Sequence, residues 1–149
     1  MMKVIFIVLI LINLLNGDFI RDNQKQVVID TSTDLMWQDN VDVIGNANKK
    51  NWADAITYCE NLNLGGYDNW SLPNFNQLYL LADRTKNNPA INSAFQNIEN
   101  SDYWSSTTIV SDTSGAWLVD FSNGSDTMNS FGKLDPHFVR CVREEELIK

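Results

Sequence analysis

The chain offers few side chains that could act as a nucleophile, a general base or a soft metal ligand, since it contains one histidine and two cysteines. His137 follows Asp135-Pro136 in a predicted turn, where a histidine is usually solvated. A catalytic base needs a partner within hydrogen-bond reach, and the sequence places none beside His137. Two cysteines and one histidine also fall short of a zinc set. We therefore predict no enzyme activity, no catalytic residue and no metal site.

Polar side chains that could bind a ligand concentrate in two predicted loop regions, 108–114 and 122–137. Carboxylate and amide oxygens in these loops are also ligands that calcium accepts, so calcium remains open although we predict no cofactor. The alternative interpretation is that they are solvated turn residues. The candidate ligand-binding residues are Asp112, Asn123, Asp126, Asn129, Lys133 and His137.

Two amphipathic helices are predicted between Trp52 and Asp83, upstream of these loops. Asn51 can cap the first helix, and Gly65-Gly66 is predicted to end it in left-handed geometry. Asn74 followed by Gln77 resembles a capping box at the start of the second helix. Both helices carry an apolar stripe, and such stripes are expected to bury against a sheet.

Short strands are predicted on both sides of the helix pair. Residues 26–39 are expected to form two strands around a turn at 30–34. Asn123-Gly124 is the strongest hairpin signal in the chain. Further strands are predicted at 103–107, 115–121, 127–131 and 138–143.

Composition limits the class of protein. The chain has 149 residues, of which 44% are hydrophobic, so it suits one domain with a substantial core. Seven Phe, five Trp and four Tyr favour strands and loops held by large side chains over a plain helix bundle. The formal net charge of −8 disfavours a nucleic-acid partner.

The first 17 residues have the layout of a secretory signal peptide. Lys3 precedes an apolar run from Val4 to Leu15, and Gly17 offers a small residue for cleavage. The run is short for a span, which needs about 20 residues. An uncleaved anchor is the alternative. We predict a secreted, periplasmic or cell-surface protein that has no membrane span after residues 1–17 are removed.

Export changes the interpretation of the two cysteines, Cys59 and Cys141. In an oxidising compartment an even number of cysteines usually indicates a disulfide, so we predict that these two are bridged. Two buried free thiols are the alternative.

Five motifs occur in an order that resembles one bacterial family: DTSTDLMWQ at 30–38, YCENLNLGGYDNWSLPN, YWSST, AWLVDF and VRCVR. Together they resemble the C-terminal domain of the Legionella collagen-like adhesin. The resemblance covers residues 26 to 144. It implies an α+β, C-type lectin-like fold, in which two helices pack on a mixed, mostly antiparallel sheet with a long loop region.

The resemblance also implies a binding or adhesion role, with a preference for sulfated polysaccharides in the adhesin itself. Sulfate binding needs convergent basic groups, whereas the Lys and Arg residues here are scattered over an acidic chain. We interpret Arg140 and Arg143 as structural partners of carboxylates. Leu72-Pro73-Asn74 is the nearest match to the calcium-binding turn of C-type lectins, and we interpret it as a helix cap.

We therefore predict a secreted or surface-associated binding domain that recognises a carbohydrate or an envelope protein and does not catalyse a reaction. The alternative is a periplasmic structural or assembly module of an envelope complex. The sequence predicts neither the ligand nor the oligomeric state.

Overall fold

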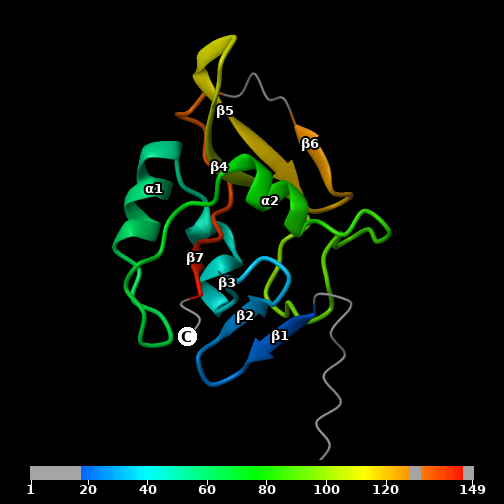
Figure 1. Ribbon diagram of the computed structural model, residues 1–149. Helices are drawn as coiled ribbons and strands as arrows, with labels where there is room; N and C mark the ends of the chain where they lie inside the picture. The colour runs from blue at the N-terminus through cyan, green and yellow to red at the C-terminus, as the bar shows by residue number, and fades with distance from the viewer. Residues whose placement is uncertain (1–17, 128–131, 146–149) are drawn as a thin grey trace, which may run out of the picture.

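The computed structural model describes residues 18–127 and 132–145, and its strands form two antiparallel sheets (Figure 1). The larger sheet contains β1 (Phe19–Asp22), β2 (Val27–Asp30), β3 (Leu35–Gln38) and β7 (Val142–Glu144), in that order. The smaller sheet contains β4 (Asp102–Ile109), β5 (Asp112–Asp120) and β6 (Ser125–Thr127), also in order. Together with the helices, this confirms the predicted α+β class. The C-type lectin-like identity of the fold stays a prediction.

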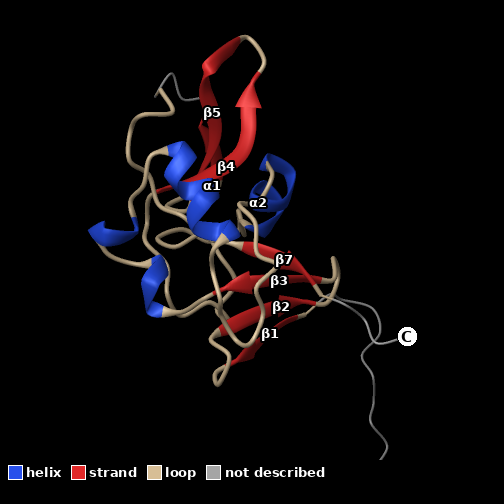
Figure 2. Ribbon diagram, turned by 90° about the vertical axis from the view of Figure 1, so that its left-hand side faces the viewer, coloured by secondary structure: helices blue, strands red, loops and turns tan. Residues whose placement is uncertain are grey.

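Two α-helices, α1 (Trp52–Glu60) and α2 (Phe75–Leu81), lie between the levels of the two sheets (Figure 2). The side chain of Asn51 accepts a hydrogen bond from the backbone of the first turn of α1, as predicted. The predicted capping box at the start of α2 is also present. Two short 3-10 helices, η1 (Val41–Val43) and η2 (Asn46–Asn48), precede α1.

Alternation along the strands builds two adjoining cores. On β2 and β3, Val28 and Trp37 belong to the core cluster of α2, whereas Val27 and Met36 belong to the cluster of α1. The same alternation occurs along β5, where Ala116 and Leu118 enter the cluster of α1 and Val119 enters the cluster of α2. Side chains from both faces of β2 and β3 therefore enter the core, one set in the cluster that contains α1 residues and the other in the cluster that contains α2 residues.

The helix ends earlier than the glycines predict. Asn61 is the C-cap of α1, and its side-chain amide donates a 2.9 Å hydrogen bond to the carbonyl of Thr57. This amide ends the helix without a left-handed glycine. Gly65 and Gly66 have φ angles of 64° and 86° and form the turn that follows, so they shape the connection between helices and not the end of α1.

Strand β1 was not predicted from the sequence, and its burial pattern is weak: Ile20 is 53% exposed and the other three positions are only partly buried. It pairs antiparallel with β2. At the other end of the chain, β7 (Val142–Glu144) contains only the last two residues of the strand predicted at 138–143. The run before it makes isolated bridges, including a parallel one between Tyr103 and Phe138.

The hairpin of β4 and β5 is longer than predicted, and its end projects away from the rest of the domain in both views (Figures 1 and 2). We call residues 108–114 the arm. The predicted hairpin at Asn123-Gly124 is confirmed, since β5 and β6 pair antiparallel across it and Gly124 has a φ of 78°. Of the predicted return strand, residues 128–131 lie outside the described chain.

The predicted signal peptide, residues 1–17, also lies outside the described residues. No helix within the described part of the chain has the length and the apolar character that crossing a membrane requires.

Candidate binding site

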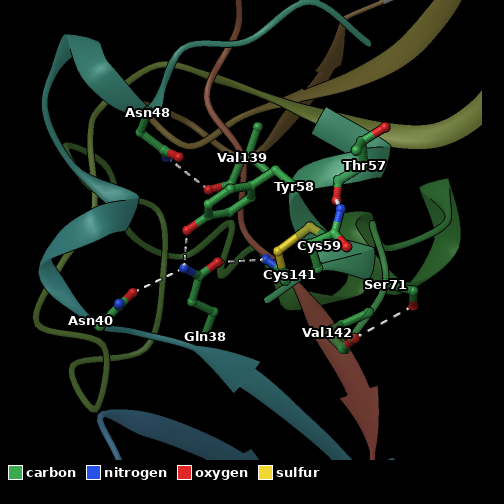
Figure 3. The surroundings of a disulfide bond; sticks show 11 residues. Gln38, Asn40, Asn48, Thr57, Tyr58, Cys59, Ser71, Val139, Cys141 and Val142 are labelled. Carbon is green, nitrogen blue, oxygen red and sulfur yellow. Dashed lines mark hydrogen bonds between the residues drawn. A yellow bond between two sulfur atoms is a disulfide. The ribbon is translucent and has the colours of Figure 1, made fainter. Parts of the chain in front are cut away.

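The predicted disulfide between Cys59 and Cys141 is confirmed (Figure 3). Buried Gln38 lies beside it and joins three segments of the chain. Its amide nitrogen donates to the hydroxyl of Tyr58 at 2.8 Å and to the side-chain oxygen of Asn40 at 2.9 Å. Its amide oxygen accepts from the backbone of Cys141 at 3.1 Å. This cross-link therefore has a hydrogen-bonded polar layer around it.

Asp39 and Arg140, both buried, form an ion pair at 3.0 Å. Arg21 pairs with the other oxygen of the same carboxylate. The backbone N–H groups of Gln96 and Asn97 donate to Asp39 at 2.9 and 3.2 Å. Because a buried carboxylate is costly unless it is paired and hydrogen-bonded, Asp39 joins Arg21 on β1, the segment 96–97 and Arg140 at the point where β3 ends.

Arg143 has a structural role of the same kind. It lies 3.3 Å from the carboxylate of Glu145, donates to the side-chain oxygen of Asn69 at 2.7 Å and stacks over the ring of Tyr67 at 4.1 Å. The interpretation of Arg140 and Arg143 as partners of carboxylates is therefore confirmed. We call the disulfide, Gln38, Asp39 and these two arginines the frame.

Asp112, the first predicted ligand residue, lies on the arm and is exposed. It accepts hydrogen bonds from the backbone and the hydroxyl of Ser114 at 3.1 and 2.6 Å. These bonds hold the pKa of Asp112 below its ordinary value. The carboxylate therefore organises its own turn, and its remaining lone pairs face solvent.

Lys133 fastens the arm to the start of α1. Its ammonium donates to the hydroxyl of Thr108 at 2.9 Å and to the carbonyl of Thr113 at 3.0 Å. It also lies 4.1 Å from the centre of the Trp52 ring. The backbone N–H of Trp52 donates to the carbonyl of Lys133 at 2.9 Å. Several of the hydrogen-bonding positions of Lys133 are thus taken up within the domain.

His137 is half-buried, and its backbone exchanges hydrogen bonds of 2.9 and 3.1 Å with Lys50. Its ring meets the ring of Trp104 edge-on at 4.7 Å. Burial lowers the pKa of His137, and the nearby carboxylates of Asp102 and Asp135 oppose that shift. The neutral imidazole therefore packs between two elements.

Asn123 and Asp126 lie at the opposite end of β5 from the arm. The side-chain oxygen of Asn123 accepts from the backbone of Ser125 at 2.8 Å, and Asp126 is exposed opposite Val119. Strand β5, Asp112–Asp120, spans about 26 Å at the usual strand rise. Asn129 lies outside the described residues.

The structure therefore brings the predicted ligand residues together only in part. Asp112 lies on the arm and Lys133 bonds to the carbonyl of its neighbour Thr113. Asn123 and Asp126 lie at the far turn, and His137 belongs to the packing around Trp104. A ligand role for these residues stays a prediction. Within residues 18–127 and 132–145, no group of three or more His, Cys, Asp or Glu side chains could hold a metal ion.

A concave surface that the sequence did not reveal surrounds the start of α2. Three open cavities of about 410, 340 and 250 Å³ meet there, and Gln77 lines all three. We call their combined lining the Gln77 surface. Its principal polar residues are Glu60, Ser71, Asn74, Gln77, Ser106 and Glu144.

The capping box orients two amide groups on this surface. The side-chain oxygen of Asn74 accepts from the backbone of Gln77 at 2.9 Å, and the side-chain oxygen of Gln77 accepts from the backbone of Asn74 at 2.9 Å. Each amide still carries an NH₂ group with two donors. Neither NH₂ group donates a hydrogen bond to another residue within the described part of the chain.

The segment that carries these amides is anchored on both sides. Ser71 and Val142 exchange backbone hydrogen bonds of 2.8 and 2.9 Å, which joins the segment to β7. The Ser71 hydroxyl also donates to the carbonyl of Val142 at 3.4 Å (Figure 3). The backbone of Ser106 donates to the carbonyl of Pro73 at 2.8 Å, and the hydroxyl of Thr107 accepts from Phe75 at 2.9 Å. The Gln77 surface is therefore held by β4 and β7 as well as by its own cap.

A comparison with protein families finds that the model of the Lcl C-terminal domain matches residues 26–143. The chain belongs to the Lcl C-terminal domain family. A comparison with curated proteins finds no significant match. The resemblance predicted from the five motifs is thereby confirmed. In this Lcl C-terminal domain, strand β1 lies before the matched residues and completes the larger sheet.

The motifs of the Lcl C-terminal domain supply both the frame and part of the Gln77 surface. Gln38, Cys59 and Arg140 each lie in a motif. Ser71 and Asn74 come from the end of the second motif, and Ser106 comes from YWSST. The capping box was the one sequence signal for this surface, but it predicts only where a helix begins.

Proposed function

We propose that this Lcl C-terminal domain is a secreted or surface-associated, non-catalytic binding module that recognises a carbohydrate or a protein. The observation that carries this proposal is the Gln77 surface, where three cavities meet on a segment anchored to two strands. A rigid, preformed site loses little conformational freedom when a ligand binds. Membership of an adhesin-associated family supports the same role.

The non-catalytic part of the proposal rests on the position of His137. Its ring packs against Trp104 and its backbone pairs with Lys50. The ring is half-buried, and this burial lowers the pKa of His137. These features describe a histidine used for packing between elements.

An assembly role is the second candidate, and exposed apolar residues near the arm favour it. Val110 on the arm is 95% exposed, and Leu134, next to the lysine that fastens the arm, is 89% exposed. Residues of this kind mark contacts with other proteins when they join into a patch. Sedimentation of the exported protein over a range of concentrations tests this role. Self-association of the wild type is the expected result, and Val110→Ser should weaken it.

The binding role is tested with the protein purified after export of the full-length chain. Labelled protein is applied to an array of neutral and sulfated glycans and to isolated envelope fractions, with calcium and then with a chelator. Saturable binding to at least one of these surfaces is expected. The absence of saturable binding to every glycan and every envelope fraction would overturn the proposal.

A further inference from the structure

Building on the proposed binding role, we infer that the ligand is an uncharged, hydroxyl-rich carbohydrate and that it binds at the Gln77 surface. The proposed site lies apart from the loops 108–114 and 122–137. The proposed ligand class differs from sulfated polysaccharides.

The cavities contain both donors and acceptors, and sugar hydroxyl groups can use both. The NH₂ groups of Asn74 and Gln77 are donors, and the carboxylates of Glu60 and Glu144 are acceptors in the same cavities. A sugar hydroxyl both donates and accepts, so it can bridge an amide and a carboxylate. Fixed polar groups of this kind set the orientation of a small ligand.

The charge of the surface selects against anions. Three carboxylates, of Asp30, Glu60 and Glu144, line the cavities. Arg143 is the one cationic residue among the described residues that line the cavities. Its guanidinium already pairs with Glu145 and donates a hydrogen bond to Asn69. A sulfate group placed here would meet more negative than positive charge, on a chain whose net charge is −8.

Apolar groups beside the amides suit the C–H faces of sugar rings. Ile56 and Leu72 line the largest cavity, and Leu80, which is 71% exposed, lines the next. The cavities of about 410 and 340 Å³ fall within the usual range of about 300 to 1,000 Å³ for ligand sites. Because all three cavities meet at Gln77, the surface fits a chain of linked sugar units better than one isolated unit.

The capping box allows a variant that removes the donors and keeps the fold. In Asn74→Asp with Gln77→Glu, each oxygen that caps α2 is retained, and Asp and Glu are favoured residues at these two cap positions. Each NH₂ group is replaced by a carboxylate oxygen. The thermal midpoint is therefore expected to stay close to that of the wild type, which circular dichroism checks.

A charge-matched control is available away from the surface. Gln24→Glu with Asn100→Asp makes the same two substitution types at exposed positions that line none of the three cavities. The probes are neutral hexose and N-acetylhexosamine oligosaccharides, with heparin as the sulfated probe, and affinities are measured by calorimetry. We expect a neutral oligosaccharide to bind the wild type and the control equally, and the Asn74→Asp, Gln77→Glu variant at least 10-fold more weakly.

Other results would overturn the inference without overturning the binding role. Stronger binding of heparin than of every neutral oligosaccharide would refute the ligand class. Unchanged affinity in the Asn74→Asp, Gln77→Glu variant, with loss in Asn123→Ala or Asp126→Ala, would place the site in the far turn. Saturable binding to an envelope fraction with no glycan binding would leave the proposed function intact and remove the carbohydrate.

Discussion

The frame and the arm are stabilised in opposite ways. In the frame, each polar group is buried and meets a partner far away in the sequence, as Asp39 meets Arg140 and Gln38 meets Cys141. On the arm, Asp112 bonds to Ser114 two residues later, and Val110 is exposed to solvent. Long-range contacts therefore fix one region, whereas the other depends on its own turn and on Lys133.

A region whose backbone is already fixed loses less conformational entropy when a ligand binds than a region held only by its own turn. The Gln77 surface borders the frame, because Arg143 and Val142 line one of its cavities and Ser71 pairs with Val142. A site on fixed backbone keeps its donors in place before the ligand arrives. The arm has few such restraints, so the comparison favours the Gln77 surface over the arm as the binding site.

Loss of the disulfide is the largest expected effect and tests whether the frame dominates stability. The bridge closes a loop with a sequence separation of 82 residues. The chain-entropy model assigns such a cross-link about 4.5 kcal/mol. Cys59→Ser with Cys141→Ser should lower the free energy of unfolding by about that amount in a denaturant titration. A loss below about 1 kcal/mol would show that other contacts hold the two segments together.

A matched pair of Asp→Asn substitutions compares the two regions directly. Asp39→Asn leaves Arg140 buried without its charge partner, so we expect a loss of about 3 kcal/mol. Asp112→Asn keeps the side-chain oxygen that Ser114 needs, and the expected change is within about 0.5 kcal/mol. Chemical denaturation of both variants gives the comparison. Equal losses would contradict the distinction between frame and arm.

Removal of the Lys133 ammonium is expected to loosen the arm and to leave the frame unchanged. Lys133→Met keeps the apolar stem over Trp52 but loses the bonds to Thr108 and Thr113. The global free energy of unfolding should fall by less than about 1 kcal/mol. Hydrogen exchange at 108–114 should become faster, while exchange at 36–39 stays the same. Faster exchange in both segments would show that the arm supports the frame.

The smallest expected effect is a change in the pH dependence of stability. Burial lowers the pKa of His137 in the folded state, whereas the unfolded chain binds a proton near the ordinary value of 6.5. Stability is therefore lost as the pH falls below 6.5 toward the folded-state pKa. His137→Gln should remove this part of the slope.

Burial raises the pKa of neighbouring Asp102, so that as the pH rises above the ordinary aspartate value of 3.8 this group makes the protein less stable. Because Asp102 is present in both proteins, the stability of His137→Gln is subtracted from that of the wild type at each pH. Thermal melts from pH 6.5 downward measure that difference. Parallel curves for wild type and His137→Gln would contradict the packing role of the neutral imidazole.

The sequence predicted those parts of the fold that local patterns determine. The capping pair Asn74 and Gln77, the turn at Asn123-Gly124 and the strand alternation at 26–39 are local signals, and each is confirmed. The expectation of export and the even cysteine count together predicted the disulfide, which is confirmed. Strand β1 could not be predicted, because its short mixed pattern becomes a strand only by pairing with β2.

The Gln77 surface also could not be predicted. It combines Glu60 on α1, Ser106 on β4 and Glu144 on β7 around the cap of α2, and no local pattern records that meeting of four elements. Loop composition instead pointed to residues such as Asp112 and Asn123. These polar residues mostly organise their own turns.

We expect the ligand to bind next to the frame and not on the arm. Hydrogen exchange with mass spectrometry, with and without a saturating neutral oligosaccharide selected from the array, tests it directly. We predict that the sugar slows exchange at 69–77 and 142–144 and leaves 108–114 unchanged. Protection confined to 108–114 or to 122–127 would contradict the claim and return the site to the loops.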